Sequence, residues 1–191
     1  MTRAVPPPVP AAFYARRADV VAPDLLGRIV RRGSVAFRIT EVEAYRQDDS
    51  ACHAFRGPTP RNAPLWGPPG HAYVYLCYGL HHMLNFVCEP EGAAAAVLVR
   101  GGEVVEGAAI VRRRRGGRLD CDGPGKVAQA LGLDRRFSGV ALDGELRVTA
   151  GEPVPSWSTT PRIGIDYASL EDRARAWRFV APRSGFLVAS P

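Results

Sequence analysis

The chain has 191 residues, of which 46% are hydrophobic and 23% are charged, as expected for one globular domain with a full core. The formal net charge is +6, and Lys126 is the only lysine, so 24 of the 25 basic residues are arginine. Arginine binds phosphate through several donors, so this surplus indicates a polyanionic partner, although a GC-rich genome would produce the same preference for arginine.

No segment of the sequence predicts export or membrane insertion. Residues 1–10 are rich in proline and lack the apolar run of a signal peptide, and no run approaches the roughly 18 apolar residues that a membrane span needs. The four cysteines, Cys52, Cys77, Cys88 and Cys121, form no C-x-x-C pair, which favours reduced thiols. We therefore expect a cytoplasmic protein that makes no contact with a membrane.

The pattern of apolar residues predicts short strands and helices within one domain, residues 13–191, after a disordered segment, residues 1–12. In chain order we expect a helix over 13–26, strands over 27–32 and 35–45, an irregular stretch over 46–70, strands over 72–78, 80–88 and 94–99, helices over 103–115 and 124–131, and strands near 145–148, 162–165 and 177–180. This order predicts an α+β fold with a largely antiparallel curved sheet, flanking helices and a protruding β-hairpin.

The second strand of the first predicted hairpin ends with acidic residues where an apolar face is expected to continue. Apolar residues occupy every second position from Val35 to Ile39, and the same alternation then presents Glu41, Glu43 and Tyr45. Carboxylates beside an aromatic ring at a strand end are typical of a site for chemistry. The alternative is an exposed strand end with solvated charges.

The hairpin predicted around Gly79 carries three tyrosines in a stretch of six residues, 73–78. Alternation puts Tyr73 and Tyr75 on one face of the strand and Tyr78 on the other, next to the glycine. Aromatic rings stack on nucleobases, and a ring at a hairpin tip can fill the gap that an extruded base leaves. The alternative is that tyrosine simply favours half-buried strands.

A series of separate motifs runs through the chain between about residues 14 and 180. It comprises Glu43-Ala44-Tyr45, Thr59-Pro60-Arg61-Asn62, the stretch from Gly67 to Leu80, Asn85, Arg100, the stretch from Gly123 to Leu131, and Arg162 to Ile165. This series resembles the alkyladenine (3-methylpurine) DNA glycosylase family, and it is far more specific than any single short pattern. The resemblance implies a monomer that removes alkylated or deaminated purines from double-stranded DNA, associated with the nucleoid and without a metal or other cofactor.

The resemblance also implies roles for individual residues. Glu43 would be the general base that activates water, Arg100 would help to hold that water, and the main-chain carbonyl of Ile163 would be a further ligand to it. The remaining residues would contact the DNA: Tyr45, His53 and Tyr75 as the stacking walls of the base pocket, with His53 also reading the purine edge, Asn85 as a steric and polar filter, Tyr78 inserted into the duplex, and Lys126 bound to a phosphate.

The residue types agree with a simple hydrolysis. A positively charged alkylpurine departs as a neutral base, so one carboxylate and one held water suffice for its release. A neutral lesion needs a proton on the leaving purine, and beside Glu43 the sequence offers only Glu41, whose role stays open. For a Schiff base with the sugar the chain offers two amines, Lys126 and the N-terminus, and Lys126 begins a helix in a Gly-Pro-Gly-Lys context that suits anion binding better than nucleophilic attack. We therefore expect a monofunctional enzyme that leaves an abasic site.

Two other functions are compatible with parts of the sequence. A non-catalytic nucleic-acid-binding module is the main alternative, and an RNA- or formyl-transfer-associated domain is a second, but a pure binder has no use for the buried carboxylate of Glu43. A zinc site is not expected, because His81 and His82 are adjacent on a strand and point to opposite faces. The run from Arg112 to Arg115 could contact phosphate or form a solvated helix end.

Overall fold

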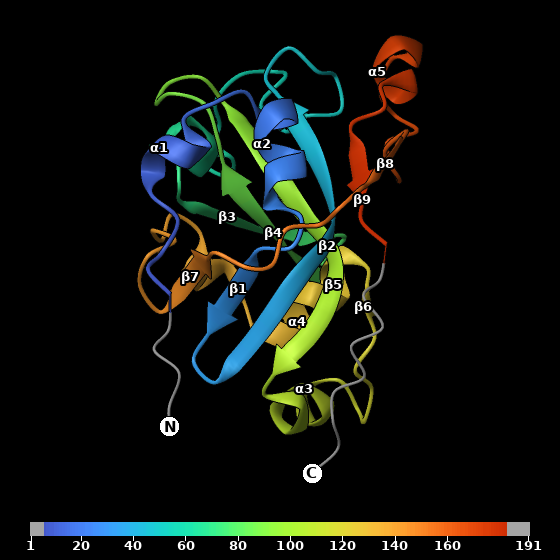
Figure 1. Ribbon diagram of the computed structural model, residues 1–191. Coiled ribbons are helices and arrows are strands. Elements are labelled where there is room, and N and C mark those ends of the chain that lie inside the picture. Colours follow the sequence, from blue (N-terminus) through green and yellow to red (C-terminus); the bar gives the residue numbers. More distant parts are fainter. Residues whose placement is uncertain (1–5, 183–191) are drawn as a thin grey trace.

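The computed structural model describes residues 6–182, and two long strands form the centre of its sheet (Figure 1). These strands, β2 (Val35–Arg46) and β5 (Ala95–Glu106), are 12 residues each and pair antiparallel along most of their length. The sheet runs in the order β3 (Ala72–Cys77), β4 (His81–Val87), β5, β2, β1 (Ile29–Arg32) and β7 (Leu146–Thr149), with β6 (Cys121–Asp122) on β5, and β9 (Arg178–Val180) joining β2 to β8 (Ser158–Thr160). The sheet is antiparallel and curls into a half-barrel, which confirms the predicted α+β fold.

Helices cover the sheet and share its core. They are α1 (Ala11–Tyr14), α2 (Ala18–Leu25), α3 (Ala108–Arg114), α4 (Pro124–Leu131) and α5 (Leu170–Ala174), with 3-10 turns at Ala63–Trp66 and Arg135–Phe137. Buried side chains of α2 and α4, such as Leu25 and Leu131, belong to the same apolar cluster as those of β2. Within residues 6–182, no helix has the length and apolar character to cross a membrane.

The pairing of β2 with β5 contains three irregularities, and two of them lie next to each other near the middle of the strands. The paired residues here are Ile39–Gly102, Glu41–Gly101 and Val42–Val99. Thr40 of β2 and Arg100 of β5 therefore have no opposite residue in this register. Such bulges change the side to which the following residues point, and they are common next to active sites. Both bulges lie where the two strands carry their charged residues.

The bulge at Thr40 corrects the prediction that the acids continue the apolar face of β2. Ile39 and Val42 both lie in the main core, although an unbroken alternation would put them on opposite faces. Glu43 and Tyr45 therefore point away from the main core, on the face opposite to Ile39. The prediction that Glu41, Glu43 and Tyr45 share one face holds, but it is not the face of the core.

Three other predicted elements differ in the structure. The helix predicted over 13–26 is divided into α1 and α2. Residues 103–106, predicted to be helical, extend β5, because Glu103 pairs with Arg38 of β2. The strand predicted near 162–165 is wrong: those residues form a loop in which Gly164 has a φ of 76°.

The predicted disordered segment, residues 1–12, is described only in part. Residues 1–5 lie outside the described residues, as do residues 183–191 at the other end. Further along, the N–H of Val9 donates to the carbonyl of Val148 (2.8 Å), and α1 begins at Ala11. Residues 8–9 thus pair with the edge of the sheet at β7, and the division of the chain at residue 12 stays a prediction.

Candidate active site

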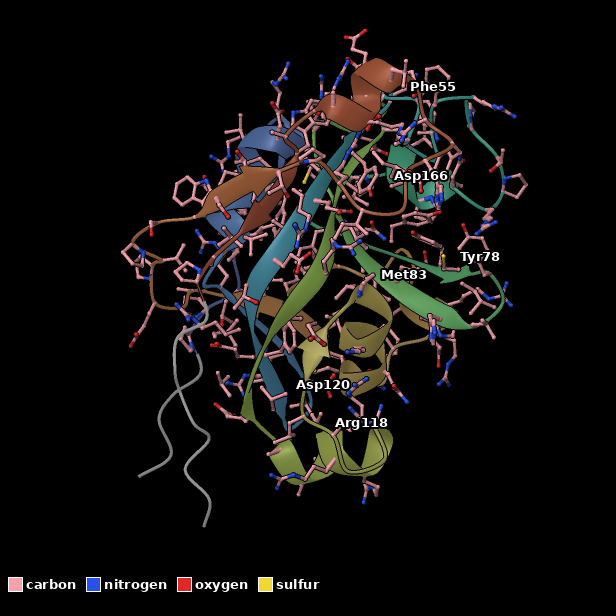
Figure 2. The ribbon with its side chains drawn as sticks, turned by 90° about the vertical axis from the view of Figure 1, so that its right-hand side faces the viewer. Phe55, Tyr78, Met83, Arg118, Asp120 and Asp166 are labelled. Atoms are coloured by element: carbon pink, nitrogen blue, oxygen red, sulfur yellow. The ribbon has the colours of Figure 1, made fainter. Side chains whose placement is uncertain are left out.

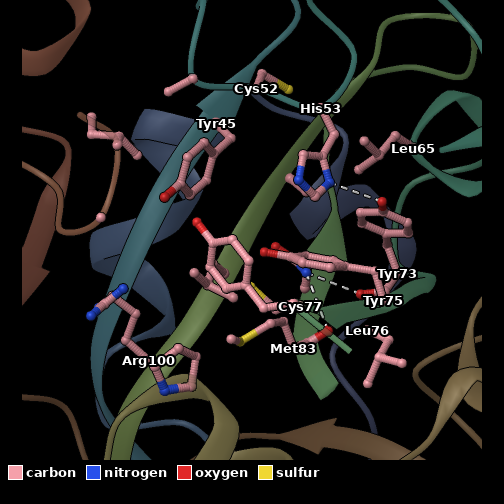
Figure 3. A pocket seen from close by; sticks show the side chains of 18 of the residues that line it. Tyr45, Cys52, His53, Leu65, Tyr73, Tyr75, Leu76, Cys77, Met83 and Arg100 are labelled. Atoms are coloured by element: carbon pink, nitrogen blue, oxygen red, sulfur yellow. Dashed lines mark hydrogen bonds between the residues drawn. The ribbon is translucent and has the colours of Figure 1, made fainter. Parts of the chain in front are cut away.

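A cavity of about 670 Å³ lies where β2, β4 and β5 meet the β3–β4 hairpin and the loop before α5 (Figure 3). This volume is within the range of small-molecule sites. Seven of the nine predicted site residues line it, namely Tyr45, His53, Tyr75, Tyr78, Asn85, Arg100 and Ile163. Glu43 lies directly behind the wall, and Lys126 lies outside it.

Glu43 is fully buried, with 0% of its surface exposed, and its carboxylate contacts three residues of the cavity wall. The Tyr45 hydroxyl donates to Oε2 (2.7 Å), and the backbone N–H of Ile163 donates to Oε1 (2.9 Å). The guanidinium of Arg100 lies 3.3 Å from Oε1 and 3.4 Å from Oε2. Burial and the nearby Glu43 charge keep the pKa of Tyr45 well above its usual value, so this hydroxyl stays a donor.

Arg100 lies between two carboxylates. Its Nε is 3.0 Å from Oε1 of Glu41, and the same oxygen accepts a hydrogen bond from Nε of Arg178 (2.7 Å). Glu41 therefore holds Arg100 from the side away from the cavity, while Glu43 contacts it beside the cavity. This geometry gives Glu41 the structural role that the sequence left open.

Three rings stand together on one wall of the cavity (Figure 3). His53 and Tyr75 meet nearly edge to face, with ring centroids 4.5 Å apart, and Tyr73 lies 5.4 Å from Tyr75. A hydrogen bond of 3.0 Å joins the Tyr73 hydroxyl to Nδ1 of His53. Burial, and to a smaller degree the positive Arg61, lowers the pKa of His53, and burial raises the pKa of Tyr73 to about 12. The wall is therefore uncharged near neutral pH.

Two asparagines hold the aromatic wall in position. Asn85 on β4 donates from its side-chain nitrogen to the carbonyl of Tyr73 (3.1 Å), which fixes its amide at the cavity. Asn62 donates to the carbonyl of His53 (2.8 Å) and to that of Gly57 (3.0 Å). Asn62 belongs to one of the family motifs, but the sequence assigned it no role, and the contact explains how the irregular stretch is ordered.

Tyr78 stands at the tip of the β3–β4 hairpin, which projects from the body of the molecule (Figure 2). Its side chain is 89% exposed, and its φ of 49° is unusual for a residue other than glycine. Leu80, on the other side of the turn, is also exposed. The hairpin protrudes as predicted, but Tyr78 lies in the turn after β3 and lines the same cavity as Tyr73 and Tyr75, so the predicted separation onto opposite faces is wrong.

Lys126 does not present a free ammonium group. It contacts Asp120 (2.7 Å) and Asp122, and hydrogen bonds to these carboxylates raise its pKa. The arginine run is also partly engaged, because Arg114 and Arg115 donate to residues of α4. A phosphate contact from Lys126 has to use the third N–H of the ammonium group or displace one of the two aspartates.

A buried ion pair supports the site and was not predicted. The side chains of Arg162 and Asp49 are both fully buried and paired, and Arg162 also donates to the carbonyl of Ala44 (2.9 Å). Its guanidinium lies 4.7 Å from the Tyr45 ring centroid and 5.3 Å from that of Trp177. Arg162 thereby joins β2 to the loop that carries Ile163, and the only sequence signal was its place in a family motif.

The described residues offer little to other chemistries. Across residues 6–182, no group of three or more His, Cys, Asp or Glu side chains is arranged to hold a metal ion. Cys52 lines the cavity beside His53, but burial raises the pKa of its thiol to about 12, so the reactive thiolate is disfavoured.

Known sequences match this chain over nearly all of its length, including the residues of the site. Residues 12–185 match the Methylpurine-DNA glycosylase (MPG) family. A protein of Nitrosococcus oceani, provisionally named a 3-methyladenine DNA glycosylase, is 51% identical over 180 residues, which cover 91% of this chain and 90% of the relative. The DNA-3-methyladenine glycosylase of Arabidopsis thaliana is 48% identical over 188 residues, which cover 95% of this chain and 74% of the relative.

Proposed function

Because this chain belongs to the methylpurine-DNA glycosylase family, we propose that it everts a damaged purine from double-stranded DNA into the Tyr75 cavity and hydrolyses its N-glycosidic bond. Its substrates are 3-methyladenine and other alkylated purines, with deaminated purines as a second class, and it acts as a monomer. The observation that carries this proposal is the buried carboxylate of Glu43, held by Tyr45, Arg100 and Ile163 at the wall of an aromatic cavity.

The β3–β4 hairpin serves to evert the base, and the aromatic rings of the cavity serve to hold it. Tyr78 is exposed at a projecting tip, so it can enter the duplex and occupy the gap left by the base. The base then stacks among Tyr45, His53 and Tyr75, with Asn85 limiting the shapes that fit. Electron-rich ring faces attract a cationic purine, and the lowered pKa of His53 keeps a competing positive charge out of the pocket.

Hydrolysis needs one water between Glu43 and the sugar. The donors Tyr45 and Ile163 each occupy one acceptor site of the carboxylate, and the contacts with Arg100 are longer. Because Glu43 has no exposed surface, a water reaches it by displacing one of these longer contacts with Arg100. Glu43 takes a proton from that water. The oxygen of the water then bonds to C1′ of the deoxyribose while the bond from C1′ to the purine breaks. An alkylated purine carries away the bonding electrons and leaves uncharged.

The reaction stops after release of the base, and the product is DNA with an intact strand and an abasic site. Strand cleavage by a glycosylase requires an amine that attacks C1′ and forms a Schiff base. Lys126 is the only lysine, and Asp120 and Asp122 hold its ammonium group outside the cavity. The chain is therefore expected to be monofunctional.

Base release from defined duplexes tests the proposal. The full chain is incubated, in excess over DNA, with duplexes that carry 7-methylguanine, hypoxanthine or ethenoadenine at one position, and an undamaged duplex of the same sequence is the control. We expect strand breaks at the lesion only after treatment with alkali. Binding of all duplexes without base release from any would contradict the proposal and support the non-catalytic DNA-binding module.

A further inference from the structure

Tyr167 is an exposed aromatic residue at the cavity to which no sequence motif assigns a role. It lies on the loop between β8 and α5 and lines the same cavity as Tyr78, which comes from the opposite part of the fold. Two thirds of its surface (66%) is exposed, yet its hydroxyl donates a hydrogen bond of 2.9 Å to the carbonyl of Ala51. A ring fixed at one end and open on its face is suited to contact a ligand.

The loop around Tyr167 is held in place by contacts at both ends. On one side, the N–H of Ile163 binds Glu43, and on the other, the N–H of Ser169 donates to Oγ of Ser50 (2.9 Å). The N–H of Ala168 also closes a turn on the carbonyl of Ile165 (2.9 Å). The ring of Tyr167 is therefore ordered before a ligand arrives and loses little conformational freedom on contact.

We propose that Tyr167 is a rim residue that packs its ring against the deoxyribose of the everted nucleotide. This inference rests on the proposed function, because it requires a nucleotide turned out of the duplex. The purine occupies the deeper part of the cavity, among the rings of Tyr75 and His53, and C1′ must lie near Glu43. The sugar is then beside the loop that starts at Ile163, and Tyr167 is the aromatic side chain that this loop exposes at the cavity.

The charge next to Tyr167 argues against a phosphate-binding role for this loop. The side chain of Asp166 is 93% exposed and lies 3.4 Å from Arg173 (Figure 2). An exposed carboxylate repels phosphate, whereas the neighbouring ring offers an uncharged surface. A contact between Tyr167 and the sugar uses that surface without bringing a phosphate to the carboxylate.

Binding of a duplex that contains a tetrahydrofuran nucleotide, an abasic analogue that cannot be cleaved, tests this inference. The affinities of wild-type protein, Tyr167→Ala and Tyr167→Phe are compared for this duplex and for an undamaged duplex of the same sequence. Stacking on an aromatic ring contributes about 1–3 kcal/mol per base, which converts to about 5- to 150-fold. For the sugar we expect Tyr167→Ala to weaken binding of the analogue duplex by about 5- to 20-fold and that of the undamaged duplex by less than about twofold. Tyr167→Phe keeps the ring and should stay close to wild type.

The neighbouring Asp166→Asn variant is the matched control. It removes a negative charge, so it should strengthen binding of both duplexes by a similar factor. An equal loss of affinity for both duplexes in Tyr167→Ala would mean that the ring lies against the helix, and no loss for either would remove Tyr167 from the site. Absence of any wild-type preference for the analogue would also overturn the rim assignment. The proposed glycosylase activity is judged separately, by base release.

Discussion

The backbone N–H of Ile163 donates a hydrogen bond of 2.9 Å to Oε1 of Glu43, across 120 positions of the sequence. This contact ties the loop before α5 to strand β2 at the proposed catalytic carboxylate. The family resemblance implied a role for the carbonyl of Ile163 as a water ligand, and the amide of the same residue has a second function in orienting the acid. The geometry of the carboxylate therefore depends on the loop as well as on β2.

Replacing Glu43 by glutamine should abolish base release and leave DNA binding nearly intact. Glutamine is similar in size to glutamate and its carbonyl oxygen can still accept from Ile163, but it cannot take a proton from water. General base catalysis typically contributes about 10²- to 10⁴-fold, so we expect the single-turnover rate on a 7-methylguanine duplex to fall by at least ~100-fold. Affinity for the same duplex, measured by fluorescence anisotropy, should change by less than about threefold.

A control variant separates the role of Glu43 as the general base from the roles of the residues around it. Glu41→Gln weakens one contact of Arg100 but leaves the carboxylate of Glu43, so it should reduce the rate much less. Near wild-type base release by Glu43→Gln would show that another group activates the water.

The two hairpins and α4 were predictable because neighbouring residues specify them. Apolar alternation marks the strands, Gly33-Ser34 and Gly79 mark the turns, and Gly123-Pro124 begins the helix. Each signal acts within a few residues and requires no knowledge of the partner strand.

The bulges at Thr40 and Arg100 could not be predicted in this way. A bulge is defined by the register between two strands that are about 60 residues apart, and alternation alone places Glu43 on the face of Ile39. The same long-range pairing extends β5 through residues 103–106 against a local pattern of helical spacing. Tertiary pairing here outweighs the local preference.

The site was predicted better from motifs than from physical patterns. The resemblance brought together seven residues that do line one cavity, although no local signal joins His53 to Tyr73. It gave no role to Arg162 or Tyr167, whose partners Asp49 and Ala51 lie more than 100 positions away. Contacts of this kind follow only from the folded chain.

Replacing Arg162 by methionine should strongly destabilise the fold. The change leaves Asp49 buried without its cation and removes the bond to the carbonyl of Ala44. Breaking a buried ion pair in this way costs about 3–5 kcal/mol, which urea denaturation followed by circular dichroism would detect as a smaller free energy of unfolding. Arg173→Met is the matched control, because its pair with Asp166 is exposed and such pairs contribute about 0–1 kcal/mol. Equal losses in both variants would contradict the supporting role of Arg162.

The stability of the protein should fall on mild acidification because of His53. Burial, followed by the charge of Arg61, lowers the pKa of this imidazole below its usual value of about 6.5, so the folded state binds a proton less readily than the unfolded state. The unfolded chain then takes up more protons as the pH falls below about 6.5, and the free energy of unfolding decreases until the pH reaches the lowered pKa. Urea titrations from about pH 7.5 to about pH 5 should show a smaller decrease for His53→Gln than for wild type.

Borohydride should trap no covalent adduct between the protein and lesion-containing DNA. A trapped adduct requires a neutral amine at C1′, whereas hydrogen bonds to Asp120 and Asp122 raise the pKa of Lys126 and keep it protonated. The ammonium also lies outside the residues that line the cavity, so it is not beside the sugar of an everted nucleotide. Gel electrophoresis after borohydride treatment measures the adduct directly, and Lys126→Ala should release base at nearly the wild-type single-turnover rate. An adduct that forms with wild type and disappears in Lys126→Ala would instead identify Lys126 as a nucleophile and the protein as a lyase.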